Sequence, residues 1–441
     1  MASDTIGVGM IGCGTVGTGV ARLLREQREL YHARLGRSIE LRRVLVRDTA
    51  RARAGAGLSG DILTSDPDVF FNTPGLDVVV EVAGGATGPV RDHVVRALEA
   101  GRHVVTANKA LLAAEGPALF ALARKHDAAI AFEASVAGGI PCITALQFGL
   151  MANRLDGLYG ILNGTCNFIL TAMTQEGEPY DAALAEAQRL GYAEADPTLD
   201  VSGQDAAQKL AILASLAFGV AVDEADVATR GVDGLDLADI HFGAELGYDI
   251  KLLAIAERRA GESAVSLAVE PCFIHDQEML AKVAGPFNAL SVYGSAVGHT
   301  LYYGPGAGQG PTASAVVSDL LNVAASWYGH AFSHLRLTPD CNARADVVAP
   351  DNRVSRYYLR LNALDVPGTM ARVTRILGDA GISLSAVLQH ESAAGQFVPV
   401  VIMTHDARYG DLKRAVGEIE NLEAIEGPVV LIRIADLPHE A

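Results

Sequence analysis

The chain has few aromatic residues and an excess of negative charge. Aromatic residues make up 6% of its 441 residues, and 35 lysines and arginines stand against 52 aspartates and glutamates. The formal net charge is −17, and no long basic cluster interrupts it. Nucleic acids and anionic membranes attract proteins with basic surfaces, so neither is expected as a partner.

Cysteine is also scarce. The five cysteines are Cys13, Cys142, Cys166, Cys272 and Cys341. They form no CxxC pair, which argues against a disulfide framework or a zinc cluster and predicts a cytoplasmic location. Residues 1–10 lack the basic start and apolar centre of a secretion signal. The longest nearly apolar run, residues 210–222, is too short to cross a bilayer and predicts a buried helix.

The length and the order of apolar segments predict an α/β protein of two or three domains. Extended segments at residues 5–11, 39–46, 77–82, 103–106 and 129–133 alternate with helical segments that include residues 91–100 and 118–126. Strands that alternate with helices indicate a doubly wound parallel sheet.

The first strand runs directly into the sequence GCGTVG, in which Gly12, Gly14 and Gly17 form a GxGxxG pattern before a helix. In that context each glycine has a function: a tight turn, close approach of a pyrophosphate, and packing of helix on strand. The phosphates lie at the positive end of the helix. The sequence therefore predicts a dinucleotide site, with a plain glycine-rich turn as the alternative.

The end of the second strand bears on the choice of dinucleotide. Arg47 and Asp48 follow this strand, well beyond the expected interval, and Arg51 and Arg53 come next. An acidic residue here binds the ribose 2′-hydroxyl of NAD, whereas arginine accommodates the 2′-phosphate of NADP. Arg47 therefore favours NADP, whereas Asp48 is compatible with NAD. A third interpretation is that both residues are ordinary surface charges.

Two further polar segments follow predicted strands of this sheet. Lys109 comes just after residues 103–106, at the edge where open α/β sheets bind ligands, although an exposed loop lysine is the simpler reading. Glu133 begins the sequence EASVAGGIP, whose carboxylate and carbonyl oxygens can face a hard cation. From spacing alone, a simple turn is the favoured interpretation of that segment.

An acidic loop at residues 191–209 is the richest segment. It carries Glu194, Asp196, Asp200 and Asp205 and leads into a helix. Ser202 and Asp205 have the spacing of a capping box, and Asp205 and Lys209 have that of an ion pair along a helix. Alternatively, the apolar helix partly desolvates Lys209, lowers its pKa and fits it for proton transfer, while the acidic residues bind a cationic substrate. In the earlier sequence LNGTCN, Thr165 or Asn167 is expected to cap a helix.

Taken together, the motifs up to about residue 340 resemble the homoserine dehydrogenase family. The motifs are GCGTVG, VVTANKALL, EASVAGGIP, LNGTCNFIL, GYAEADPTLDVSGQDAAQKLAIL and YGPGAGQGPTASAV. The resemblance implies reversible reduction of L-aspartate 4-semialdehyde to L-homoserine with NADPH or NADH, in threonine and methionine biosynthesis. The sequence departs from the family pattern at Gly310, where a bulkier residue is expected. No aspartokinase segment is expected before the first strand.

The resemblance also implies residue roles. Lys209 is expected to donate the proton to the substrate oxygen, and Lys109 to lie near nicotinamide and substrate. Glu194, Asp200 and Asp205 are expected to bind the substrate. The expected dinucleotide contacts are Gly12, Gly14, Thr15, Val16, Gly17, Arg47, Lys109, Gly191 and Gly308. Glu133 with the carbonyls of Val136, Gly138 and Ile140 resembles the family's sodium site.

The resemblance, together with these patterns, implies three domains. We expect a dinucleotide-binding domain at residues 1–134, to which residues 306–340 return, and an α+β catalytic and dimerisation domain at residues 135–305. Residues 354–441 read strand-helix-strand-strand-helix-strand, which predicts a ferredoxin-like module. This module resembles an ACT domain, with DVPG at residues 365–368 as the turn before its first helix.

An ACT domain implies binding of an amino-acid effector, and threonine is the expected one. The alternative is that the module only assists assembly. The whole chain is expected to form a homodimer or a homotetramer. Rival functions are a related amino-acid semialdehyde dehydrogenase and a protein that senses NAD(P) and an amino acid without turnover.

Overall fold

The structure is a computed structural model of the chain, and it describes residues 5–51, 55–258, 263–341, 343–391 and 395–438. The chain divides into two compact units. The first comprises residues 1–158, 207–227 and 287–345, and the second comprises residues 159–206, 228–286 and 346–441. Both units are therefore built from segments that lie far apart in the sequence.

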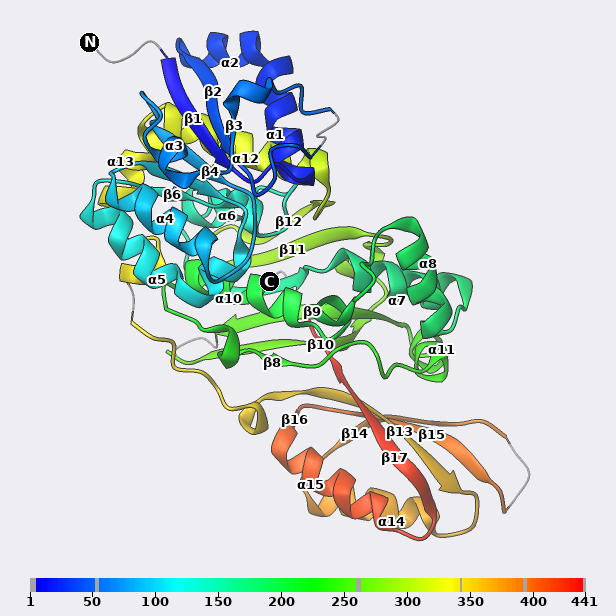
Figure 1. Cartoon of the computed structure of the whole chain (residues 1–441). Helices are drawn as coiled ribbons and strands as arrows, with labels where there is room; N and C mark the ends of the chain where they lie inside the picture. The colour runs from blue at the N-terminus through cyan, green and yellow to red at the C-terminus, as the bar shows by residue number, and fades with distance from the viewer. Residues whose placement is uncertain (1–4, 52–54, 259–262, 342, 392–394, 439–441) are drawn as a thin grey trace. The chain divides into compact units, whose positions relative to one another are not determined.

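The first unit contains a six-stranded sheet in the order β3-β2-β1-β4-β5-β6 (Figure 1). All neighbouring strands pair in parallel. The strands are β1 (Thr5–Ile11), β2 (Ser38–Leu45), β3 (Leu63–Thr64), β4 (Val78–Glu81), β5 (His103–Thr106) and β6 (Ile130–Ala131). The chain winds outward from β1 in both directions, which confirms the predicted Rossmann-type doubly wound sheet.

Helices from both ends of the first unit's sequence pack on this sheet. Helix α1 (Thr15–Glu26) packs against α12 (Gln309–Ala324). A Cβ atom on Gly19 would lie 2.9 Å from the Ala313 side chain, so glycine permits the close approach of these helices. The other helices are α2 (Arg28–Leu35), α3 (Pro67–Phe71), α4 (Pro89–Glu99), α5 (Lys109–Lys125) and α13 (Trp327–His334). The unit also contains the antiparallel hairpin of β11 (Phe287–Gly294) and β12 (Gly298–Pro305).

Helix α5 is longer than the sequence indicates. The sequence predicts a helix at residues 118–126, whereas α5 also includes Pro117 and the residues before it. Asn108 caps the helix ten residues ahead of residue 118, since its side chain accepts a hydrogen bond from the Leu111 amide at 3.1 Å. The helix continues through Pro117, and Gly116 before the proline and Leu119 after it are buried.

The second unit is built on long antiparallel strands that the sequence analysis did not locate. β9 (Tyr248–Arg258) pairs along its whole length with β10 (Val265–His275), and the short β8 (Ala228–Thr229) pairs with β10 in parallel. Its helices are α7 (Gly164–Glu176), α8 (Tyr180–Leu190), α9 (Thr198–Val201) and α11 (Leu237–Glu245). Strand β7 (Leu155–Ile161) leads into α7.

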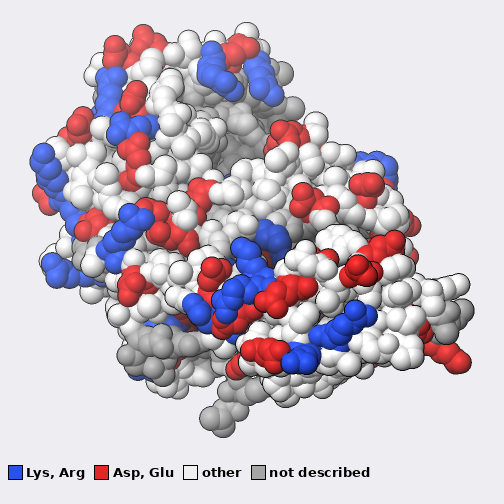
Figure 2. Space-filling view, turned by 90° about the horizontal axis from the view of Figure 1, so that it is seen from below, with Lys and Arg blue, Asp and Glu red and all other residues white. Residues whose placement is uncertain are grey.

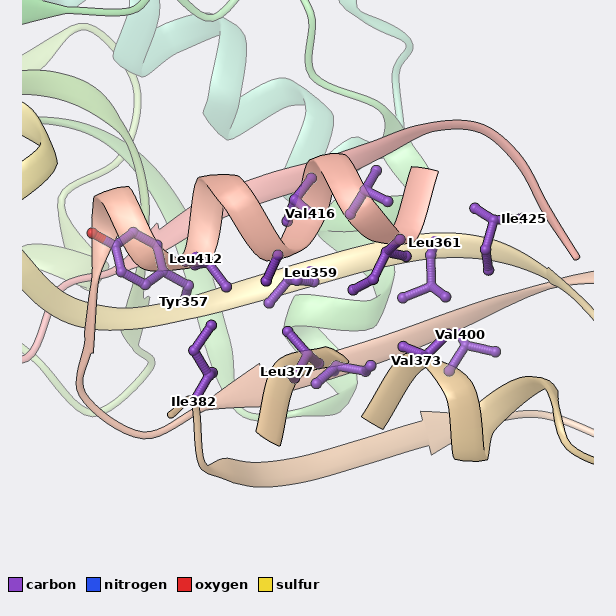
Figure 3. Packing of buried hydrophobic residues seen from close by; sticks show 14 of the residues in the cluster. Tyr357, Leu359, Leu361, Val373, Leu377, Ile382, Val400, Leu412, Val416 and Ile425 are labelled. Carbon is purple, nitrogen blue, oxygen red and sulfur yellow. The ribbon is translucent and has the colours of Figure 1, made fainter. Parts of the chain in front are cut away.

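The carboxy-terminal part of the second unit has the predicted ferredoxin-like order. It runs β13 (Val354–Leu364), α14 (Thr369–Asp379), β14 (Leu384–Gln389), β15 (Phe397–Thr404), β16 (Ala407–Arg408), α15 (Tyr409–Glu420) and β17 (Ile425–Ile434). Its four main strands have the order β17-β13-β15-β14. Figure 3 shows Val373 and Leu377 of α14 and Leu412 of α15 directed toward Leu359 and Leu361 of β13. These side chains form one buried core, as expected for a sheet covered by two helices.

This module joins the rest of its unit through a shared sheet. β17 pairs in parallel with β10, with Cys272 opposite Arg433 and Phe273 opposite Ile434. The Ala435 amide continues the pairing by donating a hydrogen bond to the Phe273 carbonyl at 2.8 Å. The module is therefore attached by backbone hydrogen bonds as well as by the chain itself.

The surface carries charges of both signs. On the face in Figure 2, acidic and basic side chains are interspersed, in agreement with the absence of a long basic cluster in the sequence. Among the described residues, no helix has the length and hydropathy of a membrane span. Cys13, Cys142, Cys166 and Cys272 are free thiols.

A buried lysine in the second unit gives a pH-dependent prediction. Lys251 on β9 is 6% exposed, and its Nζ donates to the Val283 carbonyl at 2.8 Å. Burial lowers the pKa of Lys251 from 10.5 to about 8, and the Asp249 carboxylate offsets part of this effect. Between these two pKa values the unfolded chain binds more protons, so stability rises with pH through this window. Lys251→Met removes the buried charge, and we expect it to raise the free energy of unfolding at pH 7 by about 1–3 kcal/mol.

Urea unfolding at pH 7 and pH 9.5 measures this effect. Lys251→Met should gain stability at pH 7 and lose most of the gain at pH 9.5, whereas Lys282→Met, at an exposed position, should change little at either pH. A Lys251→Met protein that is less stable than the wild type at pH 7 would show that the ammonium contributes favourably.

Candidate active site

The glycine loop after β1 has the geometry of a pyrophosphate cradle. Gly12 has φ +93°, and a Cβ atom there would lie 2.8 Å from the Ala83 backbone. A Cβ on Gly17 would lie 2.6 Å from the Gly12 carbonyl oxygen, so the first turn of α1 packs directly on the loop. The Cβ position of Gly14 instead faces open space. Thr15 and Val16 begin α1, and the positive end of this helix is where a phosphate group binds.

A buried glutamate orders the adjacent edge of the sheet. Glu81, the last residue of β4, is fully buried, and its Oε1 accepts hydrogen bonds from the Ala83 and Gly84 amides at 2.8 and 3.0 Å. Its Oε2 accepts the Thr106 hydroxyl at 2.7 Å, and the same hydroxyl accepts the Asn108 amide at 3.0 Å. Glu81 thus fixes the loops after β4 and β5 side by side. The sequence analysis missed it, although a lone carboxylate at the end of an apolar strand is a usable signal.

The second predicted lysine begins a helix instead of lying in a loop. Lys109 is the first residue of α5, directly after the Asn108 cap, and it is partly buried. The Asn108 side chain also donates to the Gly85 carbonyl at 2.8 Å. The Asn-Lys pair is therefore held at the carboxyl edge of the sheet, next to the loop that Glu81 orders.

The predicted cation segment is a tight, buried loop. Both carboxylate oxygens of Glu133 accept hydrogen bonds: Oε1 from the Ile143 amide at 2.8 Å, and Oε2 from the amide and hydroxyl of Thr144. Ala137 has φ 48°, a left-handed conformation, and the Ile140 amide donates to its carbonyl at 2.7 Å. Because the Glu133 carboxylate is already satisfied, the backbone carbonyls of this loop are the oxygens left to face a cation.

A second carboxylate is buried behind Glu133. Asp319 on α12 accepts the Glu133 amide at 2.8 Å and is 3% exposed. Burial raises the pKa of Asp319, and the neighbouring Glu133 charge raises it further. Burial also raises the pKa of Glu133, while its bonds to residues 143 and 144 work against that change. Asp319 therefore anchors the start of this loop to α12 through the Glu133 amide.

Two glycine-rich motifs from distant parts of the sequence meet at this loop. A Cβ on Gly138 would lie 2.8 Å from the Thr312 hydroxyl, and one on Gly139 would lie 2.5 Å from the Pro305 carbonyl. Gly308, with φ 113°, is the N-cap of α12. Gly310, where the family pattern has a bulkier residue, has open space at its Cβ position, so the departure leaves the packing unchanged.

In the second unit, one asparagine joins two of the predicted substrate carboxylates. The Asn163 amide group donates to Asp200 Oδ1 at 2.7 Å and to Asp205 Oδ2 at 2.8 Å. The Thr165 hydroxyl lies 3.1 Å from Asp200 Oδ2 and 2.7 Å from the Tyr192 carbonyl. Asp205 is only 6% exposed. Two carboxylates held this close form a strongly negative site that suits an ammonium group.

Asn163 also caps α7, and this corrects the sequence prediction. Its side-chain oxygen accepts the Cys166 amide at 2.8 Å, so neither Thr165 nor Asn167 is the cap. Asn167 lies one turn into the helix and donates to the Gly285 carbonyl at 2.9 Å. Asn163 of the LNGTCN sequence therefore both caps α7 and binds the two carboxylates.

The predicted capping box before Lys209 is wrong. Ser202 has helical backbone angles and ends α9, and its hydroxyl donates to the Leu199 carbonyl at 3.4 Å. Helix α10 (Gln204–Phe218) begins only after Gly203, whose φ is +83°. The chain turns sharply at this glycine, so Ser202 ends α9 and is not the N-cap of α10.

Helix α10 carries the main catalytic candidate. Asp205 lies in its first turn and Lys209 one turn later, so both side chains project from the same face. Lys209 is partly buried. Its positive charge lowers the pKa of the buried Cys142 thiol, although burial and the Glu133 charge raise that pKa overall. Lys209 is therefore close enough for its charge to act on the Cys142 thiol, and it follows Asp205 by one turn of α10.

The remaining predicted residues lie at exposed positions. Glu194 is exposed on the turn between α8 and α9, and Gly191, with φ +78°, is the C-cap of α8. Arg47 and Asp48 are exposed after β2, and Asp48 Oδ1 accepts the Ala50 amide at 2.8 Å. Arg53 lies outside the described residues.

Comparison with known proteins agrees with this arrangement. Family models described as "Homoserine dehydrogenase, NAD binding domain", "Homoserine dehydrogenase" and "ACT domain" match residues 12–133, 141–321 and 357–424. Homoserine dehydrogenases of Pseudomonas aeruginosa and Neisseria gonorrhoeae are 44% and 41% identical to the chain over 436 residues, covering 98% of it and 99% of each relative. The crystal structure of a homoserine dehydrogenase from Thiobacillus denitrificans is 44% identical, with a TM-score of 0.92 and coverage of 98% of both chains. The similarity extends over all the motifs described above.

Proposed function

The chain belongs to the homoserine dehydrogenase family, and from this premise we propose which of its residues carry the reaction. It is an NAD(P)-dependent oxidoreductase of amino-acid biosynthesis with a carboxy-terminal ACT regulatory domain. In the proposed direction it reduces L-aspartate 4-semialdehyde to L-homoserine, for threonine and methionine synthesis. The bound dinucleotide supplies a hydride to the aldehyde carbon.

Asp200 and Asp205 bind the ammonium group of the substrate. Their oxygens are fixed by Asn163 and Thr165, and Asp205 is buried, so the pair attracts a compact cation more strongly than exposed carboxylates do. Glu194, on the exposed turn before α9, contributes a further negative charge. The observation that carries the proposal is this Asn163-held carboxylate pair, of which Asp205 lies one turn before Lys209 in α10.

Lys209 donates the proton. As the aldehyde carbon receives hydride, its oxygen gains negative charge, and an ammonium group beside it stabilises that charge and protonates the oxygen. In the reverse direction the same group, as the free amine, accepts the hydroxyl proton of homoserine. Lys109, held at the sheet edge by the Asn108 cap, contacts the nicotinamide and the substrate.

The experiment for this proposal follows absorbance at 340 nm with L-homoserine and NADP or NAD. Homoserine-dependent reduction supports it. Tight dinucleotide binding without reduction, in folded protein, would favour the sensing function, and turnover only with another amino-acid semialdehyde would favour the related dehydrogenase.

NADP is the proposed cofactor, through Arg47. The glycine cradle fits the pyrophosphate of either dinucleotide, and the exposed Arg47 guanidinium suits a 2′-phosphate, whereas one Asp48 oxygen is engaged in its own turn. We expect Arg47→Ala to lower kcat/KM for NADP about tenfold and to leave that for NAD within about twofold, as for loss of one charge-assisted hydrogen bond. Steady-state kinetics with both cofactors, with Arg34→Ala at an exposed position of α2 as the control, measure the change. Preference of the wild type for NAD would contradict the assignment and favour Asp48.

The remaining assignments complete the proposal. Gly12, Gly14, Thr15, Val16, Gly17, Gly191 and Gly308 contact the dinucleotide. A sodium ion fits the backbone carbonyls of Val136, Gly138 and Ile140 beside Glu133, since carbonyl oxygens are ligands for hard cations. Threonine is the proposed ACT effector, and the enzyme is proposed to be a cytoplasmic homodimer or homotetramer with the three domains predicted from sequence.

A further inference from the structure

A chain of polar contacts in the second unit leads from the ACT domain toward the substrate carboxylates. Arg433 on β17 donates from one terminal guanidinium nitrogen to Glu257 Oε2 at 3.1 Å. The other oxygen of the same carboxylate, Oε1, accepts the Tyr159 hydroxyl at 2.7 Å. Glu257 lies on β9 and Tyr159 on β7, so three strands are linked by one carboxylate.

At the ACT end of this chain, two of the three guanidinium nitrogens of Arg433 donate hydrogen bonds, and the third, Nη1, is buried without a hydrogen-bond partner. Arg433 is 5% exposed, and its Nε donates to the Ser355 hydroxyl at 3.1 Å, which in turn donates to the Ile434 carbonyl at 3.0 Å. A buried guanidinium is costly unless it is paired. Glu270 lies 3.8 Å from Arg433 but also accepts a hydrogen bond from Arg353, so Glu257 is the carboxylate that takes the Arg433 hydrogen bond. The position of Glu257 is therefore set by the ACT strand.

At its other end, the chain of contacts reaches Asn163 and the two carboxylates that it binds, which we call the Asn163 clamp. Tyr159 is 3% exposed and lies four residues before Asn163, which holds Asp200 and Asp205. The segment between them is buried, and a Cβ on Gly160 would lie 2.8 Å from the Leu162 side chain. Because only three buried residues separate Tyr159 from Asn163, a displacement of Tyr159 is expected to move Asn163 as well.

We propose that Tyr159, Glu257 and Arg433 are positioning residues through which the ACT domain fixes the Asn163 clamp in its substrate-binding geometry. The inference rests on the proposed substrate role of Asp200 and Asp205. A change in β17 on effector binding would reach the substrate site through the same three side chains.

The test measures KM and kcat for L-homoserine in Tyr159→Phe, Glu257→Gln and the double variant of the full-length protein. Each single substitution keeps the side-chain shape and removes one link, the hydroxyl of Tyr159 or the negative charge of Glu257. We expect each to raise KM for homoserine about three- to tenfold, with kcat and the KM for the dinucleotide within about twofold. The double variant should be no worse than the more affected single variant, because both changes break one pathway.

Tyr358→Phe is the matched control. Its hydroxyl donates to the buried Asp239 at 2.9 Å and also connects the ACT domain to the rest of the unit, but through α11. It should leave KM for homoserine unchanged. An equal rise in KM with Tyr358→Phe, or additive effects in the double variant, would overturn the proposal, since general loosening would then explain the data.

Asn163→Ala distinguishes failure of the proposed substrate site from failure of the proposed positioning pathway. If Asn163→Ala leaves KM unchanged, the proposed substrate site is wrong. If Asn163→Ala raises KM while Tyr159→Phe and Glu257→Gln do not, the substrate site stands and the positioning pathway is wrong. Melting temperatures of all variants identify any protein that is not folded, and Glu257→Gln decides the result if Tyr159→Phe is unstable.

Discussion

Lys209→Ala should lower kcat for homoserine oxidation by about 10²- to 10⁴-fold, the usual contribution of a general acid or base. The reason is that the substrate oxygen loses the group that exchanges its proton and stabilises its charge. Dinucleotide affinity should stay within about twofold, because the glycine cradle and the first turn of α1 are unchanged. Steady-state kinetics together with fluorescence titration of NADPH measure both quantities.

Lys125→Ala is the control for this prediction. Lys125 is an exposed lysine at the end of α5 in the same unit, and its removal should leave kcat unchanged. Parallel loss of turnover and of dinucleotide binding in Lys209→Ala would mean that Lys209 supports the fold and is not the proton donor.

Asp205→Asn should raise KM for homoserine about 30- to 1,000-fold, a cost of about 2–4 kcal/mol for removing one partner of a buried charged contact. The neutral amide has nearly the shape of the carboxylate and can still accept the Asn163 hydrogen bond, but it no longer attracts the substrate ammonium. KM for the dinucleotide should not change. Because the amide oxygen keeps the Asn163 hydrogen bond, the melting temperature should fall by only a few degrees.

Asp181→Asn provides the comparison for Asp205→Asn. Asp181 is an exposed carboxylate in the first turn of α8, in the same unit, and its neutralisation should alter KM less than about twofold. If Asp205→Asn leaves KM for homoserine unchanged and lowers only the melting temperature, Asp205 is a structural residue and the substrate ammonium binds elsewhere.

The dinucleotide loop was predictable from sequence because its signal is local. Gly12 and Gly17 are required within six residues of one another by a turn of positive φ and by a helix that packs on it. The four main strands of the ACT domain were predictable for a similar reason, since its strands and helices alternate over short distances. Each of these features is specified by neighbours along the chain.

Of the residues at the proposed substrate site, Asp205 and Lys209 were predicted from sequence, but Asn163 was not. The spacing of Asp205 and Lys209 places both on one face of α10, but the same spacing suggested a capping box that does not form, because Gly203 turns the chain between α9 and α10. Asn163 gave no signal, since its partners lie 37 and 42 residues later in the sequence. The contact between Tyr159 and Glu257 spans 98 residues and was likewise visible only in the fold.

The measurement that tests the central claim most directly compares L-homoserine with 4-hydroxybutanoate, which has the same alcohol and carboxylate but no ammonium group. The rate of NADP reduction is followed at 340 nm with each compound. Oxidation of homoserine with kcat/KM at least about 100-fold higher than for 4-hydroxybutanoate is expected, as for a substrate recognised through a buried carboxylate pair. Equal rates with both compounds, or no homoserine-dependent reduction with NADP or NAD, would contradict the account.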